Sequence, residues 1–150
     1  MSRLKWYKCM TVLLLVFILP VMAHAQSSVN TDASGLALEG YDPVAYFAQG
    51  EAVRGLESIS AVHEGARYLF ASENHRELFL EAPADYLPAY GGYCAWAVGQ
   101  GYIADIDPRA WTISGSRLFL NYSRSVHRRF NRNLDANITA ADANWPGLRP

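Results

Sequence analysis

The chain has 150 residues, of which 51% are hydrophobic and 18% charged, and its formal net charge is −1 at neutral pH. This length and apolar content predict one domain with a packed core rather than a disordered chain. The absence of a basic excess argues against a nucleic-acid-binding protein.

The first 25 residues have the pattern of a secretory signal peptide. Arg3, Lys5 and Lys8 precede an almost wholly apolar run, Met10–Met22, and a small-x-small sequence then ends before Gln26. These 13 apolar residues are fewer than the about 20 that a membrane-spanning helix needs. We therefore expect cleavage near Ala25-Gln26 and a periplasmic or secreted protein; an uncleaved anchor is the alternative.

Cleavage would leave residues 26–150, which have no lysine and carry ten arginines against 14 acidic residues, a net charge of −4. Residues 26–37 are small and polar and predict a flexible segment. Residues 38–148 form the predicted domain. No second apolar span follows the leader, so no transmembrane segment is expected in the exported chain, and no internal repeat exceeds a few residues.

The first predicted element is a short helix that Asp42-Pro43 opens and Gly50 ends. Alternation of apolar and polar residues then predicts a β-hairpin with strands at 56–63 and 67–71, joined by a turn at Glu64-Gly65. Ser72 caps a predicted helix that runs to about Glu81. Pro83 follows this helix and stops it.

Small residues flanked by aromatic ones predict a tight turn at Tyr90–Trp96, and residues 93–98 favour a short helix. A second hairpin is expected at 111–113 and 118–122, followed by a helix at 123–133 and a last turn that Thr139 caps. The predicted fold class is α+β: a small antiparallel sheet formed from two hairpins and covered by short helices.

Several of these motifs resemble the YHS domain family, over roughly Leu38–Leu148. They are Gly40–Phe47, Tyr68–Ser72, Phe79, Pro83, Tyr86, Tyr90–Ala95, Asp107-Pro108, Trp111 and Ala143–Pro146, of which the later ones resemble an exported, longer branch of the family. The resemblance implies the small α+β fold. Some relatives bind metals through cysteines, but Asp42, Ala45 and Ala71 occupy the matching positions here, so that role does not carry over.

Cys94 is the only cysteine after the leader, because Cys9 lies within it. Three interpretations remain open: a packed small residue, a metal ligand, or a reactive thiol. A copper or zinc site would need Cys94 together with His63 and His75, since a soft metal takes more than one good ligand. His127 is excluded from this set because it lies among arginines that would repel a cation.

Two further features are candidates for binding. Arg124, Arg128 and Arg132 share one helix face, which suits an anionic partner or solvent exposure. Aromatic residues are concentrated around the Tyr90-Gly91-Gly92-Tyr93 turn and could stack on a planar ligand or fill the core. They are Tyr86, Tyr90, Tyr93, Trp96, Tyr102 and Trp111.

The chain has no nucleophile elbow, phosphate loop or His-Glu-x-x-His sequence. We therefore expect a non-enzymatic binding or accessory module of the cell envelope, whose partner is a transition metal, a small ligand or an envelope protein. The alternatives are a thiol-dependent redox enzyme that uses Cys94, which would need a cation or a helix N-terminus beside the thiol, and a protein-interaction domain that uses the arginine face.

Overall fold

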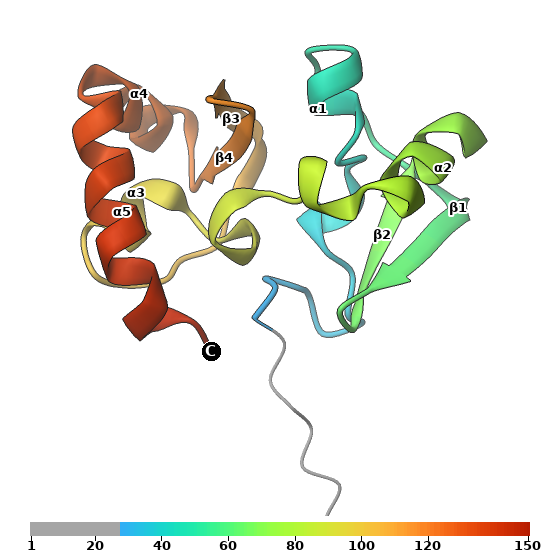
Figure 1. Cartoon of the computed structure of the whole chain (residues 1–150), viewed down its shortest axis with the longest axis horizontal. Helices are drawn as coiled ribbons and strands as arrows, with labels where there is room; N and C mark the ends of the chain where they lie inside the picture. Colours follow the sequence, from blue (N-terminus) through green and yellow to red (C-terminus); the bar gives the residue numbers. More distant parts are fainter. Residues whose placement is uncertain (1–27) are drawn as a thin grey trace, which may run out of the picture.

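A computed structural model describes residues 28–150, and the predicted leader lies outside these residues. The fold is α+β, as predicted, with two two-stranded antiparallel sheets among the described residues (Figure 1). The two hairpins do not join into one sheet, because each pairs only within itself. Helices of four to fifteen residues surround the two sheets.

The first half of the molecule is built around the hairpin β1 (Leu56–His63) and β2 (Ala66–Phe70). A 3₁₀ turn, η1 (Leu38–Gly40), and the short helix α1 (Ala45–Ala48) precede the hairpin, and helix α2 (Glu73–Glu81) follows it. The Ser72 side chain accepts a hydrogen bond from the backbone N–H of His75, the expected cap at the start of α2. We call residues 38–81 the first repeat.

The second half has the same order of elements. The turn η3 (Ala89–Gly92) and helix α3 (Ala95–Gly99) precede the hairpin β3 (Asp107–Ser114) and β4 (Arg117–Asn121), and helix α4 (Arg124–Arg132) follows. The Ser123 side chain accepts from the N–H of Val126, as Ser72 does for His75. We call residues 90–132 the second repeat; in Figure 1 the two repeats lie side by side.

The two repeats agree in backbone detail. The strands and the following helix begin 51 residues apart, at 56, 66 and 73 in one repeat and at 107, 117 and 124 in the other. Both hairpins pair in the same register, and both carry an irregularity near the start of the first strand. Each repeat also opens with three consecutive residues of positive φ, at 38–40 and 90–92. The molecule therefore contains a structural duplication that the sequence analysis did not detect.

Helix α5 (Leu134–Leu148) has no counterpart in the first repeat and lies on the outside of the second (Figure 1). The sequence predicts only a last turn here, whereas the helix has 15 residues. The Asn144 side chain donates to the carbonyl oxygens of Val98 and Gly99, at 3.0 and 3.1 Å. Gly99 lets α3 and α5 approach closely, since a Cβ there would lie 3.3 Å from the carbonyl oxygen of Asn137.

The segment 28–37 is tied to both repeats, so the predicted flexibility of residues 26–37 does not hold for this part. The backbone N–H of Asn30 donates to the Gly91 carbonyl oxygen at 2.8 Å, and the N–H of Ala37 donates to that of Arg67 at 2.9 Å. The ordered domain therefore includes this segment as well as the predicted 38–148.

The hydrophobic core has two parts. The larger part lies in the first repeat and between the repeats, and contains Tyr46, Tyr68, Phe70 and Phe79. The smaller part joins the second repeat to α5 through residues that include Tyr90, Phe119 and Phe130. The aromatic residues thus supply most of the large buried side chains, as a domain of this size requires.

Candidate functional site: the Cys94 pocket

Cys94 lies between the Gly91-Gly92 turn and helix α3, where the backbone places its thiol against strand β4. The residue is 1% exposed, and its Sγ accepts a hydrogen bond from the backbone N–H of Tyr122 at 3.3 Å. The thiol itself faces Oδ1 of Asn121 at 3.9 Å. Both of these partners are uncharged, and Cys94 is the N-cap residue of α3, so of the two features that the redox-enzyme alternative names the structure places a helix N-terminus beside the thiol.

The thiol borders a cavity of about 210 Å³ with an almost wholly apolar wall. We call this cavity the Cys94 pocket. Helix α3, the loop that follows it, and the start of α4 contribute the lining. The lining residues are Cys94, Trp96, Ala97, Tyr102, Ala104, Tyr122 and Val126.

Large apolar side chains stand exposed beside this pocket. Tyr102 is 48% exposed and Tyr122 is 60% exposed, and both line the cavity. Ile103, next in sequence to Tyr102, is 41% exposed. Exposed apolar surface around an apolar cavity is typical of a binding site rather than of a leftover packing defect.

Comparison of the repeats explains why the cavity exists. Asp42 in the first repeat corresponds to Cys94: the N–H of Ala71 donates to Oδ2 of Asp42 at 2.8 Å, as the N–H of Tyr122 donates to Cys94. The position of Val126, however, is held by His75, whose Nδ1 lies 2.6 Å from Oδ2 of Asp42.

Tyr46 of α1 is 1% exposed and reaches the second repeat, where it donates its hydroxyl to the Pro108 carbonyl oxygen at 2.9 Å. His75, paired with Asp42, therefore occupies in the first repeat the position at which the second has the smaller Val126 beside its cavity.

The predicted metal ligands are not brought together. His75 is paired with buried Asp42, and the ring of His63 packs edge-on against Phe79 with 5.8 Å between centroids. Cys94 belongs to the other repeat. Among residues 28–150 no three His, Cys, Asp or Glu side chains form a group that could hold a metal ion. The Cys94–His63–His75 set for copper or zinc therefore finds no support in the geometry.

The Tyr90–Tyr93 turn is a structural device that anchors α5. The Tyr90 hydroxyl donates to Oδ1 of Asp142 at 2.9 Å, and the rings of Tyr90 and Tyr93 both pack against Trp145. A Cβ at Gly91 would lie 2.0 Å from the carbonyl oxygen of Ser28, so only glycine fits there. Gly91 and Gly92 also have positive φ, which suits glycine.

The other predicted aromatic ligand-binding residues divide between core and pocket. Trp96 and Tyr102 line the Cys94 pocket, whereas Tyr86 packs on Phe47 and Trp111 on Tyr46. The pocket residues that the sequence analysis missed are Ala97, Ala104, Tyr122 and Val126. Comparison of α4 with α2 at a spacing of 51 residues could have identified Val126 as the small counterpart of His75.

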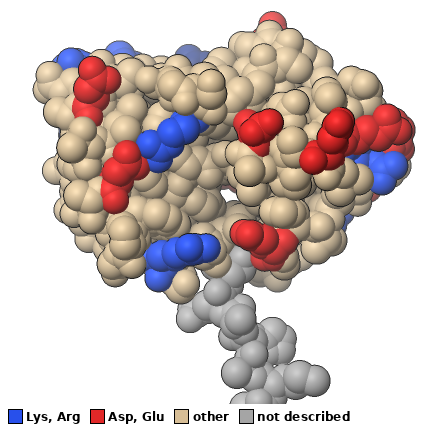
Figure 2. Space-filling model, in the orientation of Figure 1, with Lys and Arg blue, Asp and Glu red and all other residues tan. Residues whose placement is uncertain are grey.

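The arginine face on α4 is exposed to solvent. Arg124, Arg128 and Arg132 form no ion pair within the part of the chain that the structure describes. His127, on the same helix, has its Nε2 2.8 Å from Oγ1 of Thr112. Basic groups are visible at the upper edge of the molecule over α4 in Figure 2. This helix face is therefore charged, but its side chains do not form a defined binding site.

No helix within residues 28–150 has the length and apolar character to cross a membrane. Comparisons with models of protein families, with curated proteins and with solved structures find nothing that matches this chain. The resemblance to the YHS domain family therefore stays a prediction.

Proposed function

We propose that this protein is a non-enzymatic binding module of the cell envelope that holds a small, planar, apolar molecule in the Cys94 pocket. The observation that carries the proposal is the open, apolar cavity at a position that the first repeat fills. The envelope location rests on the signal-peptide pattern.

The lining of the pocket defines the chemical class of the ligand. Trp96, Tyr102 and Tyr122 provide aromatic surfaces against which a planar ring can pack. The Cys94 sulfur is a soft, polarizable contact, and sulfur lies favourably near aromatic rings. No charged side chain lines the pocket, so a charged ligand would lose its hydration without a compensating partner. A soft metal is also disfavoured, because the lining contains one thiol and no imidazole or thioether.

Ligand titration of the purified protein tests the proposal. Indole, toluene and benzoate would be added in turn, and chemical shifts of the residues around Cys94 would be followed by NMR. We expect indole and toluene to bind in fast or intermediate exchange with shifts centred on the pocket. Benzoate, which carries a charge, is expected to bind at least about ten-fold more weakly, because burying an uncompensated charge is costly.

A filling substitution supplies the matched control. Val126→Phe places a ring in the cavity and is expected to abolish indole binding, whereas Val62→Phe adds the same ring on β1, where Val62 is 69% exposed, and should leave binding intact. Bound indole should also slow alkylation of Cys94 by iodoacetamide. Absence of binding by both apolar probes, or undiminished binding by folded Val126→Phe, would refute the proposal.

A further inference from the structure

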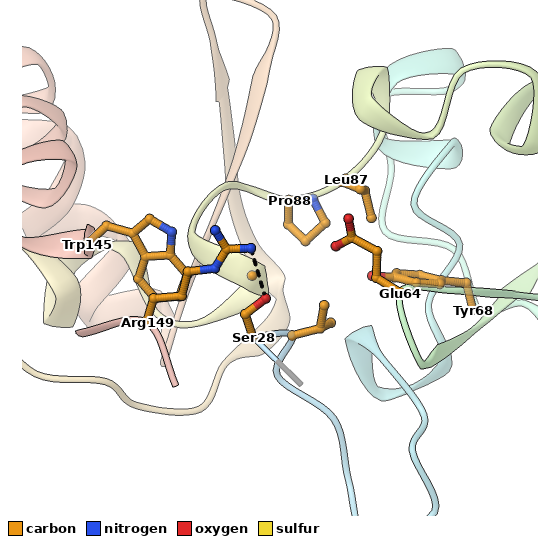
Figure 3. Close-up of a pocket in the computed structure, with 9 residues that line it drawn as sticks. Ser28, Glu64, Tyr68, Leu87, Pro88, Trp145 and Arg149 are labelled. Atoms are coloured by element: carbon orange, nitrogen blue, oxygen red, sulfur yellow. Dashed lines mark hydrogen bonds between the residues drawn. The ribbon is translucent and has the colours of Figure 1, made fainter. Parts of the chain in front are cut away.

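A second pocket lies between the two repeats, away from Cys94. Its volume is about 180 Å³, and four segments that are distant in the sequence contribute to it. They are the β1–β2 turn and β2 of the first repeat, residues 87–91 between the helical turn η2 (Pro83–Asp85) and α3, the end of α5, and the segment that begins at Ser28 (Figure 3). We call it the inter-repeat pocket.

Two opposite charges face this pocket from its two sides. The carboxylate of Glu64 points in from the β1–β2 turn, and the guanidinium of Arg149 points in from the end of α5 (Figure 3). Figure 2 shows from the same side an acidic and a basic group at the lower edge of the gap between the repeats.

Neither charge has an ionic partner among residues 28–150. Arg149 Nη2 donates only to the Ser28 hydroxyl, at 3.2 Å. Two unpaired, opposite charges that share one cavity can both be satisfied by one molecule that carries both signs.

A buried hydroxyl in the same wall lacks a partner. Tyr68 is 1% exposed, lines the inter-repeat pocket, and its Oη has no hydrogen-bond partner within the described part of the chain. Burial, and then the charge of Glu64, raise the pKa of Tyr68 well above its ordinary value, so the hydroxyl keeps its proton. A buried polar group without a partner costs free energy, and a ligand atom at this position would remove that cost.

We propose that the inter-repeat pocket binds a small amino-carboxylate, such as a free amino acid with an apolar side chain. The ligand carboxylate pairs with the Arg149 guanidinium and accepts from the Ser28 hydroxyl. The ligand ammonium pairs with Glu64 and donates to Tyr68 Oη. The apolar side chain of the ligand packs against Leu87, Pro88 and the indole of Trp145.

The arrangement of charges discriminates against simpler ligands. A phosphate or a dicarboxylate would bring a second negative charge toward Glu64, and a diamine would bring a positive charge toward Arg149. Uncharged apolar molecules would pair with neither charge and would leave the Tyr68 hydroxyl without a partner. This site is therefore chemically distinct from the Cys94 pocket and does not depend on the function proposed for that pocket.

Calorimetric titration with glycine, leucine and phenylalanine tests the inference. Two further probes remove one end of leucine at a time: 3-methylbutylamine keeps the ammonium, and 4-methylpentanoate keeps the carboxylate. We expect leucine or phenylalanine to bind, and each single-ended probe to bind about ten-fold more weakly or worse, because each loses a charge-assisted contact.

Three variants address the residues individually: Arg149→Gln, Glu64→Gln and Tyr68→Phe. Each is expected to weaken binding of the same amino acid by about ten-fold. Arg132→Gln, Glu77→Gln and Tyr41→Phe are the matched controls and should bind as the parent does. Tyr68→Phe is the most informative variant, because its hydroxyl has no partner in the protein and the ligand-free variant should be no less stable than the parent.

Binding of no amino acid in the series would overturn the inference, as would equal binding of leucine and 3-methylbutylamine. Parent-like affinity in all three variants, with unchanged circular dichroism, would also overturn it. Indole binding at the Cys94 pocket should be unaffected by Glu64→Gln, so failure at one pocket can be told apart from failure at the other.

Discussion

At corresponding positions in the two repeats, a backbone N–H donates to side chains of different chemistry. In the first repeat the N–H of Ala71 meets the carboxylate of Asp42, and in the second the N–H of Tyr122 meets the sulfur of Cys94. The N–H groups of Asp42 and Cys94 themselves donate to corresponding carbonyl oxygens, those of Val53 and Ala104, at 2.8 and 2.9 Å. The frame that positions the side chain is therefore shared, and only the side chain differs.

The difference shows how the same backbone frame can surround either a filled core position or a cavity. The first repeat buries a hydrogen-bonded polar pair, Asp42 and His75, which must be complete to be tolerated in a core. The second repeat replaces this pair with a thiol and a valine, which need few hydrogen bonds and together occupy less space. We infer that the first repeat serves mainly stability, whereas the second has room for a ligand.

The largest effect is expected from Asp42→Ala. Asp42 is fully buried, and its carboxylate accepts from the N–H groups of Val44, Ala45 and Ala71 as well as facing His75. Removing it leaves these groups buried without a partner and should lower the free energy of unfolding by about 3–5 kcal/mol. The corresponding change Cys94→Ala removes one weak acceptor and should cost about 1 kcal/mol. Urea denaturation of both variants would measure the contrast, which equal losses would contradict.

The positive-φ turns give the next comparison. Gly91 corresponds to Glu39, and both have positive φ, at 61° and 51°. The side chain of Glu39 is exposed, whereas a Cβ at Gly91 would meet the Ser28 carbonyl oxygen. We expect Gly91→Ala to destabilise the protein by about 2–3 kcal/mol through overpacking. Glu39→Gly should instead be neutral or raise stability by up to about 1 kcal/mol, since glycine adopts this conformation without strain. Thermal unfolding of the pair would check this, and a tolerated Gly91→Ala would contradict the close approach of residue 28.

A transplant of the second repeat's residues tests whether the frame is truly shared. The double variant Asp42→Cys with His75→Val puts a thiol and a valine into the first repeat, as at Cys94 and Val126. The new sulfur can accept the N–H of Ala71, and no buried charge is left unpaired, but the N–H groups of Val44 and Ala45 lose the carboxylate oxygen that accepts them. We expect a loss of about 2 kcal/mol in the free energy of unfolding, below that of Asp42→Ala because His75 is no longer left without its partner. A double variant as unstable as Asp42→Ala would show that the two positions are not interchangeable.

The elements that the sequence predicted correctly are those with local causes. Ser72 caps α2, and the Glu64-Gly65 turn joins the first hairpin, because these features depend only on neighbouring residues. Helix α5 was predicted only as a last turn capped by Thr139. It extends over Leu134–Leu148, and its end is held by packing of Trp145 on Tyr90 and Tyr93, a contact with a distant segment.

The duplication and the pockets could not be predicted for a different reason. The repeats share few identical residues beyond Gly40-Tyr41 and Gly92-Tyr93, so the likeness resides in backbone conformation and hydrogen bonds. Cys94 was recognised as unusual from its sequence context, but the rest of its pocket comes from α4 and the loop after α3. The inter-repeat pocket joins residues as distant as Ser28 and Arg149, a contact that no local pattern encodes.

The smallest expected effect concerns the attachment of α5, which only the second repeat has. Arg117 donates to both oxygens of Asp142, at 3.1 and 2.8 Å, and Tyr90 donates to one of them. The hydrogen bonds from Arg117 hold the pKa of Asp142 below its ordinary value. This effect is larger than that of burial, which alone would raise the pKa. A lowered pKa in the folded state means that the charged carboxylate stabilises the fold at neutral pH and that this contribution is lost as the pH falls through the folded-state pKa.

Asp142→Asn keeps an acceptor for Tyr90, but it removes the charge and replaces one of the two oxygens that accept from Arg117 with an NH2 donor. Because the side chains of Arg117 and Asp142 are 43% and 47% exposed, solvent screens the pair, and the expected loss at pH 7 is only about 0.5 kcal/mol. Urea denaturation at pH 7 and at several values below pH 4 should show the parent and the variant converging in acid, since the parent carboxylate is then protonated. A difference that stays constant with pH would mean that Asp142 holds α5 through hydrogen-bond geometry alone, without a contribution from its charge.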